Sequence, residues 1–138
     1  MPAFDEELAI AAPPEEVWKL LYDPVGFPRW WAGVGSVDAT TPEGYTLYPD
    51  GYPDFPMPQL LSASRADGVV RISCLVSDLV FEWRLRAAPD GATLLAAHVE
   101  IPAAESARLA VQREVIHTSL RRLAALAAGA AGQDSRPS

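Results

Sequence analysis

The feature that most constrains this chain is the uninterrupted run from Ala103 to Ala131. It follows Pro102, has no proline or glycine before Gly129, and is rich in Ala, Leu, Arg and Glu, which favour helices. A proline just before the first turn and a glycine near the end are typical of helix boundaries. At about 1.5 Å per residue the helix would be roughly 40 Å long, the full width of a small domain. The run therefore predicts one long C-terminal helix.

One side of this predicted helix is apolar, because residues along it recur at spacings of three and four. That side comprises Leu109, Gln112, Val115, Ile116, Ser119, Leu120, Leu123 and Leu126. The charged residues Glu114, Arg121 and Arg122 lie largely away from it. An apolar stripe of this kind has to be buried against another element. We expect the rest of the chain to form the sheet that receives it.

The chain before Pro102 alternates between polar and apolar residues, as strands do, apart from two short helical segments. The first helix is predicted to begin at Pro13 and to end at Asp23, since the residue before a proline avoids helical angles. A second helical turn is expected within Gly26–Trp31. The alternation places apolar residues, Val76 among them, on one face and indicates an antiparallel sheet covered on that face only. The predicted strands are Phe4–Ala11, Val34–Thr40, Tyr45–Tyr48, Gln59–Arg65, Val69–Val76, Leu79–Ala87 and Thr93–Ile101.

Composition limits the class of protein. The 138 residues suffice for one domain, predicted over residues 1–132, with a disordered tail at 133–138. A formal charge of −7 argues against nucleic-acid binding, which normally needs a basic surface. The single cysteine, Cys74, cannot form an internal disulfide, and no signal peptide or membrane span is visible at the start or along the chain. We therefore expect a cytoplasmic protein.

Two segments near the N-terminus resemble the SRPBCC superfamily. They are Ala11-Ala12-Pro13-Pro14-Glu15-Glu16-Val17-Trp18-Lys19-Leu20-Leu21-Tyr22-Asp23-Pro24 and Phe27-Pro28-Arg29-Trp30-Trp31-Ala32-Gly33-Val34. This superfamily includes START-domain, pollen-allergen-like and polyketide cyclase/dehydrase-like proteins. The resemblance implies an α+β helix-grip fold: a curved antiparallel sheet of about seven strands wrapped around the C-terminal helix, with two short helices between strands 1 and 2. It also implies a hydrophobic cavity between sheet and helix.

Such a cavity would be lined by inward-facing strand residues, by aromatic residues of the second helical turn and the proline-rich loop Pro49–Pro58, and by the helix stripe. The candidate ligand-binding residues are Trp30, Trp31, Tyr45, Tyr48, Phe55, Ile72, Cys74, Phe81, Trp83, Gln112, Ile116 and Ser119. The alternative is ordinary core packing for the aromatic residues. Gln112 and Ser119 either orient a ligand or lie where the stripe meets solvent.

Catalytic and metal-binding signatures are scarce. His117 on the long helix is the candidate acid or base, with a partly solvated structural role as the alternative. His98 lies on the polar side of its strand, and neither histidine has a second ligand at metal-binding spacing. We therefore predict no metal site and no cofactor.

The sequence leaves three functions open. The first is binding of a hydrophobic or polycyclic small molecule in the internal cavity. The second is a cyclase, aromatase or dehydratase that folds a polyketide-like substrate in the same cavity and moves protons through a few polar groups. The third is an interaction domain like the activators of heat-shock ATPases, which would act through its outer surface. A homodimer also stays open, because nothing in the sequence sets the oligomeric state.

Overall fold

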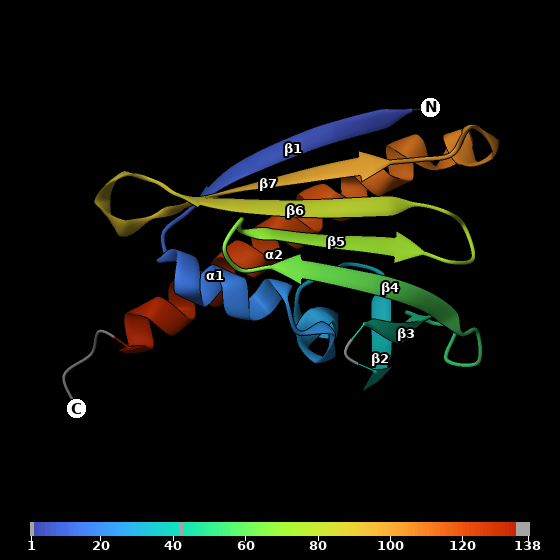
Figure 1. Cartoon of the computed structure of the whole chain (residues 1–138), viewed down its shortest axis with the longest axis horizontal. Coiled ribbons are helices and arrows are strands. Elements are labelled where there is room, and N and C mark those ends of the chain that lie inside the picture. The colour runs from blue at the N-terminus through green and yellow to red at the C-terminus, as the bar shows by residue number, and fades with distance from the viewer. Residues whose placement is uncertain (1, 42, 135–138) are drawn as a thin grey trace.

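The computed structural model describes residues 2–41 and 43–134, which fold as one antiparallel sheet packed against helices. The sheet has seven strands in the spatial order β1-β7-β6-β5-β4-β3-β2 (Figure 1). In chain order the elements are β1 (Ala3–Ile10), α1 (Pro14–Leu21), η1 (Pro24–Arg29), β2 (Val34–Thr41), β3 (Gly44–Pro49), β4 (Met57–Ser64), β5 (Val69–Cys74), β6 (Val80–Ala87), η2 (Pro89–Gly91), β7 (Thr93–Glu100), η3 (Ala103–Arg108) and α2 (Leu109–Asp134).

The helix-grip prediction is confirmed. The long helix α2 crosses one face of the sheet, and α1 and η1 lie between β1 and β2 in the chain (Figure 1). At one end β2 and β3 turn away from the direction of the other strands, so the sheet curves around the helix. No helix in the described ranges is long and apolar enough to cross a membrane.

The predicted long C-terminal helix is confirmed, but its bounds differ from 103–131 at both ends. Residues Ala103–Arg108 form a 3-10 turn, and the α-helix runs from Leu109 to Asp134. Leu109 is the first stripe residue that packs against the core, whereas most of the preceding turn is exposed. Regular helical geometry thus begins where the apolar stripe meets the sheet. Of the predicted tail, residues 133 and 134 belong to the helix, and 135–138 lie outside the described residues.

The predicted strands differ from the structure mainly at their ends. β5 ends at Cys74, and the chain turns there through a hydrogen bond of 3.0 Å from the Asp78 amide to the Cys74 carbonyl. Val76, which was predicted to lie on the covered face of the sheet, is therefore 52% exposed. The proline-rich loop is also shorter than predicted, because Met57 and Pro58 already pair with β3.

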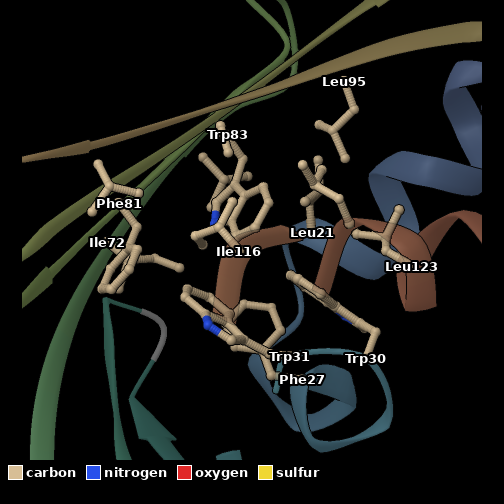
Figure 2. Packing of buried hydrophobic residues seen from close by; sticks show 14 of the residues in the cluster. Leu21, Phe27, Trp30, Trp31, Ile72, Phe81, Trp83, Leu95, Ile116 and Leu123 are labelled. Carbon is tan, nitrogen blue, oxygen red and sulfur yellow. The ribbon is translucent and has the colours of Figure 1, made fainter. Parts of the chain in front are cut away.

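Beneath the middle of α2 the molecule is filled by aromatic rings (Figure 2). Trp30 and Trp31, which directly follow η1, both meet Trp83 of β6 edge-to-face, with centroids 5.3 and 5.2 Å apart. Trp30 also donates a hydrogen bond of 3.1 Å from Nε1 to the Leu20 carbonyl, which ties the end of η1 to α1. This aromatic core fixes the distance between the sheet and the helix.

Candidate ligand-binding pocket

A pocket of about 490 Å³ lies between the start of α2 and the end of the sheet that carries β3 and β4. Its size is within the range typical of small-molecule sites. The sheet side is formed mainly by Tyr45, Leu47, Met57, Gln59, Cys74 and Phe81. The helical side is formed by Ala107, Arg108, Val111, Gln112 and Val115. The pocket is thus mostly apolar, with a few polar groups on both sides.

Three polar residues form a lateral row across the sheet side of the pocket. Tyr45 on β3 lies opposite Gln59 on β4, and Gln59 lies opposite Cys74 on β5. Each of the three is at most 5% exposed. We call Tyr45, Gln59 and Cys74 the polar row. Strand register brings these residues together although they are far apart in the sequence.

Hydrogen bonds fix the middle of the polar row. The Gln59 side-chain amide donates from Nε2 to the Met57 carbonyl, at 3.2 Å, and to Cys74 Sγ, at 3.3 Å. Both amide protons are therefore used by the protein itself. The carbonyl oxygen Oε1 of Gln59 has no hydrogen-bond partner among the described residues.

The protonation of Cys74 reflects two opposing effects. Burial raises the pKa of its thiol, but hydrogen bonds from the Ser77 side chain and backbone, the Val76 backbone and the Gln59 side chain lower it. The hydrogen bonds prevail, so the pKa of Cys74 lies below its ordinary value. The turn after β5 thus stabilises a thiolate at the wall of the pocket.

Tyr45 shows the opposite behaviour. Burial, and to a smaller extent the nearby Cys74, raise the pKa of its phenol far above the ordinary value. The hydroxyl is therefore protonated at neutral pH and able to donate a hydrogen bond. Within the described part of the chain it makes no hydrogen bond, although only 4% of the residue is exposed and it lines the pocket.

The structure brings five of the candidate ligand-binding residues to this pocket, namely Trp31, Tyr45, Cys74, Phe81 and Gln112. Four others are fully or almost fully buried in the solid core instead: Trp30, Ile72, Trp83 and Ile116. Tyr48 is half-buried and Phe55 is 53% exposed, and neither lines the pocket.

Ser119 also lies outside the pocket lining, and its hydroxyl is occupied by the protein. Its Oγ accepts a hydrogen bond of 2.9 Å from the Ala32 amide and donates one of 2.6 Å to the Val115 carbonyl. The side chain thereby fastens the segment after η1 to α2. This polar position in the stripe is explained by a structural bridge.

His117 lies on the other side of α2, in a groove of about 700 Å³ next to β1. Its Nδ1 is 2.6 Å from Glu6 Oε1, and Arg121 Nε donates to its Nε2 at 3.1 Å. Since the Arg121 group only donates, Nδ1 carries the proton that bonds to Glu6. Both ring nitrogens are engaged, and the groove is separate from the apolar pocket.

Sequence reasoning missed three polar residues of the pocket, Gln59, Ser77 and Arg108. Every second residue of a strand points to the same face of the sheet, and Gln59 lies between Met57 and Leu61 in this alternation. The pattern could therefore have identified Gln59 as a residue of the covered face. Ser77 lies in a turn, where alternation gives no information. Its contact with Cys74 depends on how the chain folds back after β5.

Similarity to solved structures extends over nearly the whole chain. The protein XoxI from Bacillus cereus is 13% identical, with a TM-score of 0.78 over 92% of this chain and 96% of that one. A START superfamily protein from Mycobacterium smegmatis is 13% identical, with a TM-score of 0.69 over 96% and 99% of the two chains. At such identities the likeness concerns the fold alone.

A third similar structure is the di-domain ARO/CYC StfQ from the steffimycin biosynthetic pathway. It is 15% identical, with a TM-score of 0.72, and the match covers 94% of this chain but 51% of StfQ. This chain therefore spans about half the length of that protein. Comparison with curated proteins gives no match.

The sequence itself identifies the family. A family profile described as polyketide cyclase / dehydrase and lipid transport matches residues 1–128. The match covers the elements from β1 to most of α2, including every described side chain of the pocket. Together with the START-type neighbours it confirms the SRPBCC resemblance of the N-terminal segments. The chain belongs to the polyketide cyclase/dehydrase and lipid transport family.

Proposed function

We propose that this protein binds a hydrophobic or polycyclic small molecule in the pocket between the sheet and the start of α2. The observation that carries the proposal is the pocket itself, a hollow of about 490 Å³ in a protein whose core is otherwise filled by aromatic rings. Its walls are mostly apolar, and a few polar groups converge on it, as in small-molecule sites generally. The family description, which includes lipid transport, supports the same reading.

Filling the pocket from the helix tests this proposal. Val115 is half-buried and lines the hollow, so Val115→Trp is expected to occupy the space with an indole ring. Binding of naphthalene and anthracene, measured by equilibrium dialysis, should weaken by about tenfold or more, which corresponds to a loss of about 1.4 kcal/mol. Circular dichroism should show an unchanged fold.

The matched control is His117→Ala, which alters the charged groove on the other side of the same helix. It is expected to change hydrocarbon affinity by less than about twofold, because a surface side chain outside the pocket contributes little to binding. Equal weakening by both substitutions would contradict binding at the pocket. Binding to wild type that Val115→Trp leaves intact would contradict it as well.

A second candidate function is a polyketide cyclase-like activity in the same pocket. It is favoured by the family description and by the structural likeness to the ARO/CYC protein StfQ. The pocket would hold a flexible substrate in a folded conformation and so favour one ring closure. Incubation with a poly-β-ketone thioester should then give a cyclised product, detected by mass spectrometry, that Val115→Trp abolishes. Binding of the thioester without any cyclised product would favour the binding function.

A further inference from the structure

We infer that Cys74 is a modification site of the pocket, whose sulfur is oxidised to a sulfenic acid by apolar organic hydroperoxides. This inference rests on the proposed binding function and adds a reaction to it. It starts from the polar row, which the binding of a wholly apolar molecule does not use. The row places a nucleophile, a hydrogen-bond acceptor and a hydrogen-bond donor on neighbouring strands of one pocket wall.

The nucleophile is the Cys74 sulfur, which is surrounded by hydrogen-bond donors. Gln59 Nε2 donates to it at 3.3 Å, and Val76 and Ser77 add further hydrogen bonds from the turn after β5. Donors of this kind stabilise the thiolate, which is the nucleophilic form of cysteine. Cys74 is only 4% exposed but lines the pocket, so a reagent reaches the sulfur by way of the pocket. Because the chain has no other cysteine, no internal disulfide consumes it.

The other two members of the polar row match the two oxygens of a hydroperoxide. Gln59 Oε1 has no partner among the described residues, so it can accept a hydrogen bond from the O–H group. The Tyr45 hydroxyl makes no hydrogen bond within residues 2–41 and 43–134, lines the pocket and can donate to the second oxygen. Tyr45 is itself only 4% exposed. An acceptor and a donor beside a nucleophilic sulfur are therefore what an O–O–H group requires.

The reaction is a displacement at the terminal oxygen of the hydroperoxide. The Cys74 sulfur forms a bond to this oxygen while the O–O bond breaks, and the hydroxyl proton stays on the oxygen, which gives S–OH. The electron pair of the O–O bond remains on the inner oxygen, which leaves as an alkoxide and takes a proton from water. Burial raises the pKa of Tyr45, so its hydroxyl stays neutral and stabilises the alkoxide by a hydrogen bond. The sulfur is oxidised, and the hydroperoxide is reduced to an alcohol.

The remaining walls select the organic part of the hydroperoxide. Leu47, Phe81 and Val115 are among the apolar lining residues of this hollow of about 490 Å³. An aromatic or alkyl group gains free energy when it is buried against such walls, whereas hydrogen peroxide has no apolar surface to bury. The pocket therefore favours an apolar hydroperoxide over hydrogen peroxide.

The test measures sulfenic acid at Cys74 by trapping with dimedone and mass spectrometry. Cumene hydroperoxide and hydrogen peroxide are compared at equal concentrations, and the rate ratio in the urea-unfolded chain gives their intrinsic difference. In the folded wild type, the ratio should favour cumene hydroperoxide by at least about tenfold more than in the unfolded chain, through burial of the cumyl group. Val115→Trp fills the pocket and should remove this preference.

Two further variants separate the roles of the polar groups. Tyr45→Phe should slow oxidation by cumene hydroperoxide by about fivefold or more, since one hydrogen bond to the leaving oxygen is lost. Tyr48→Phe is the matched control on the same strand, outside the pocket lining, and should stay within about twofold. Ser77→Ala acts on the sulfur, so it should slow both reagents by the same factor. Circular dichroism checks that each variant is folded.

The outcomes distinguish this inference from the function it rests on. If naphthalene and anthracene bind the wild type but the folded chain shows no added preference for cumene hydroperoxide, the binding function stands and the inference is overturned. A preference that survives Val115→Trp, or a rate that Tyr45→Phe leaves unchanged, overturns it as well. If neither hydrocarbon binds, the pocket function itself fails, and the inference falls with it.

Discussion

The start and the middle of α2 cover different halves of the interior. In the filled half, beneath the middle of α2, the stripe residues Ile116, Leu120 and Leu123 are at most 2% exposed and meet the aromatic core (Figure 2). In the open half, beneath the start of α2, Gln112 and Val115 are only half-buried and border the pocket. The stripe is continuous in the sequence, but its partners differ, because tryptophan rings fill the space beneath the middle of the helix and smaller residues of β3 and β4 leave it open beneath the start.

This difference shows how one fold combines a rigid frame with a binding space. The core residues Trp30 and Trp83 hold the helix at a fixed distance from the sheet. The strands that curve away at the other end then cannot close onto the helix, so a hollow remains. The stability of the protein should therefore depend mainly on the filled half.

The largest effect is expected from a pair of leucine substitutions. Leu95→Ala, in the filled half where Leu95 is 0% exposed, should lower the free energy of unfolding by about 3–5 kcal/mol, since it leaves a cavity. Leu47→Ala should lower it by only about 1 kcal/mol, because Leu47 is half-buried and already borders the hollow. Urea denaturation measures both. Equal losses would mean that the two halves are packed alike.

A smaller effect is expected at the bridge between the halves. Ser119→Ala removes the acceptor of the partly buried Ala32 amide, and the loss of this hydrogen bond should lower the free energy of unfolding by about 1 kcal/mol. The exposed Ser106→Ala, in the 3-10 turn before α2, is the control and should stay within about 0.5 kcal/mol.

Amide hydrogen exchange refines this second prediction. In Ser119→Ala the Ala32 amide should exchange faster than in the wild type, because its hydrogen bond is gone. Unchanged exchange at Ala32 would show that Ser119 does not fasten this segment to the helix, whatever the change in stability.

The smallest effect is expected for the reactivity of Cys74 with iodoacetamide. The thiolate is the reactive form, and because its pKa is lowered in the folded state, alkylation should begin at a lower pH than in the urea-unfolded chain. Ser77→Ala removes one of the hydrogen bonds that lower the pKa, so the rate profile should move to higher pH. At neutral pH the rate should fall severalfold, since one hydrogen bond is worth about 1 kcal/mol.

Ser73→Ala is the matched control for this experiment. Ser73 lies next to Cys74 on β5 but on the opposite face of the sheet, so its removal should leave the rate profile in place. A folded-state profile that coincides with that of the unfolded chain would contradict the hydrogen-bonded thiolate.

Much of the fold could be predicted from the sequence because its signals are local. The spacing of Leu109, Ile116 and Leu123 identifies a helix face, and the alternation in 80–87 identifies a strand face, without any knowledge of their partners. The 3-10 turn over 103–108 could not be predicted, because its alanines and Glu105 suit either kind of helix. Packing of Leu109 against the core decides where the α-helix begins.

The candidate site could be predicted only in part. The alternation of strand residues correctly placed Cys74 and Phe81 on the covered face of the sheet, whereas Tyr45 was a candidate because it belongs to a cluster of aromatic residues in the sequence. The alternation shows which face of the sheet a residue occupies, but not whether that residue packs in the core or borders the pocket. Ile72 and Cys74 lie two positions apart on the same face of β5, yet only Cys74 lines the pocket. Strand register and the volume of neighbouring side chains decide that, and both arise only in the folded chain.

Trp31 stands at the border between the filled half and the hollow. Its indole stacks on Trp30, with centroids 5.4 Å apart, and it also lines the pocket. An aromatic occupant in contact with Trp31 would disturb the electronic transitions of the coupled indoles. The near-ultraviolet emission of the protein should therefore change on occupancy, so that the chain carries its own optical reporter and needs no attached dye.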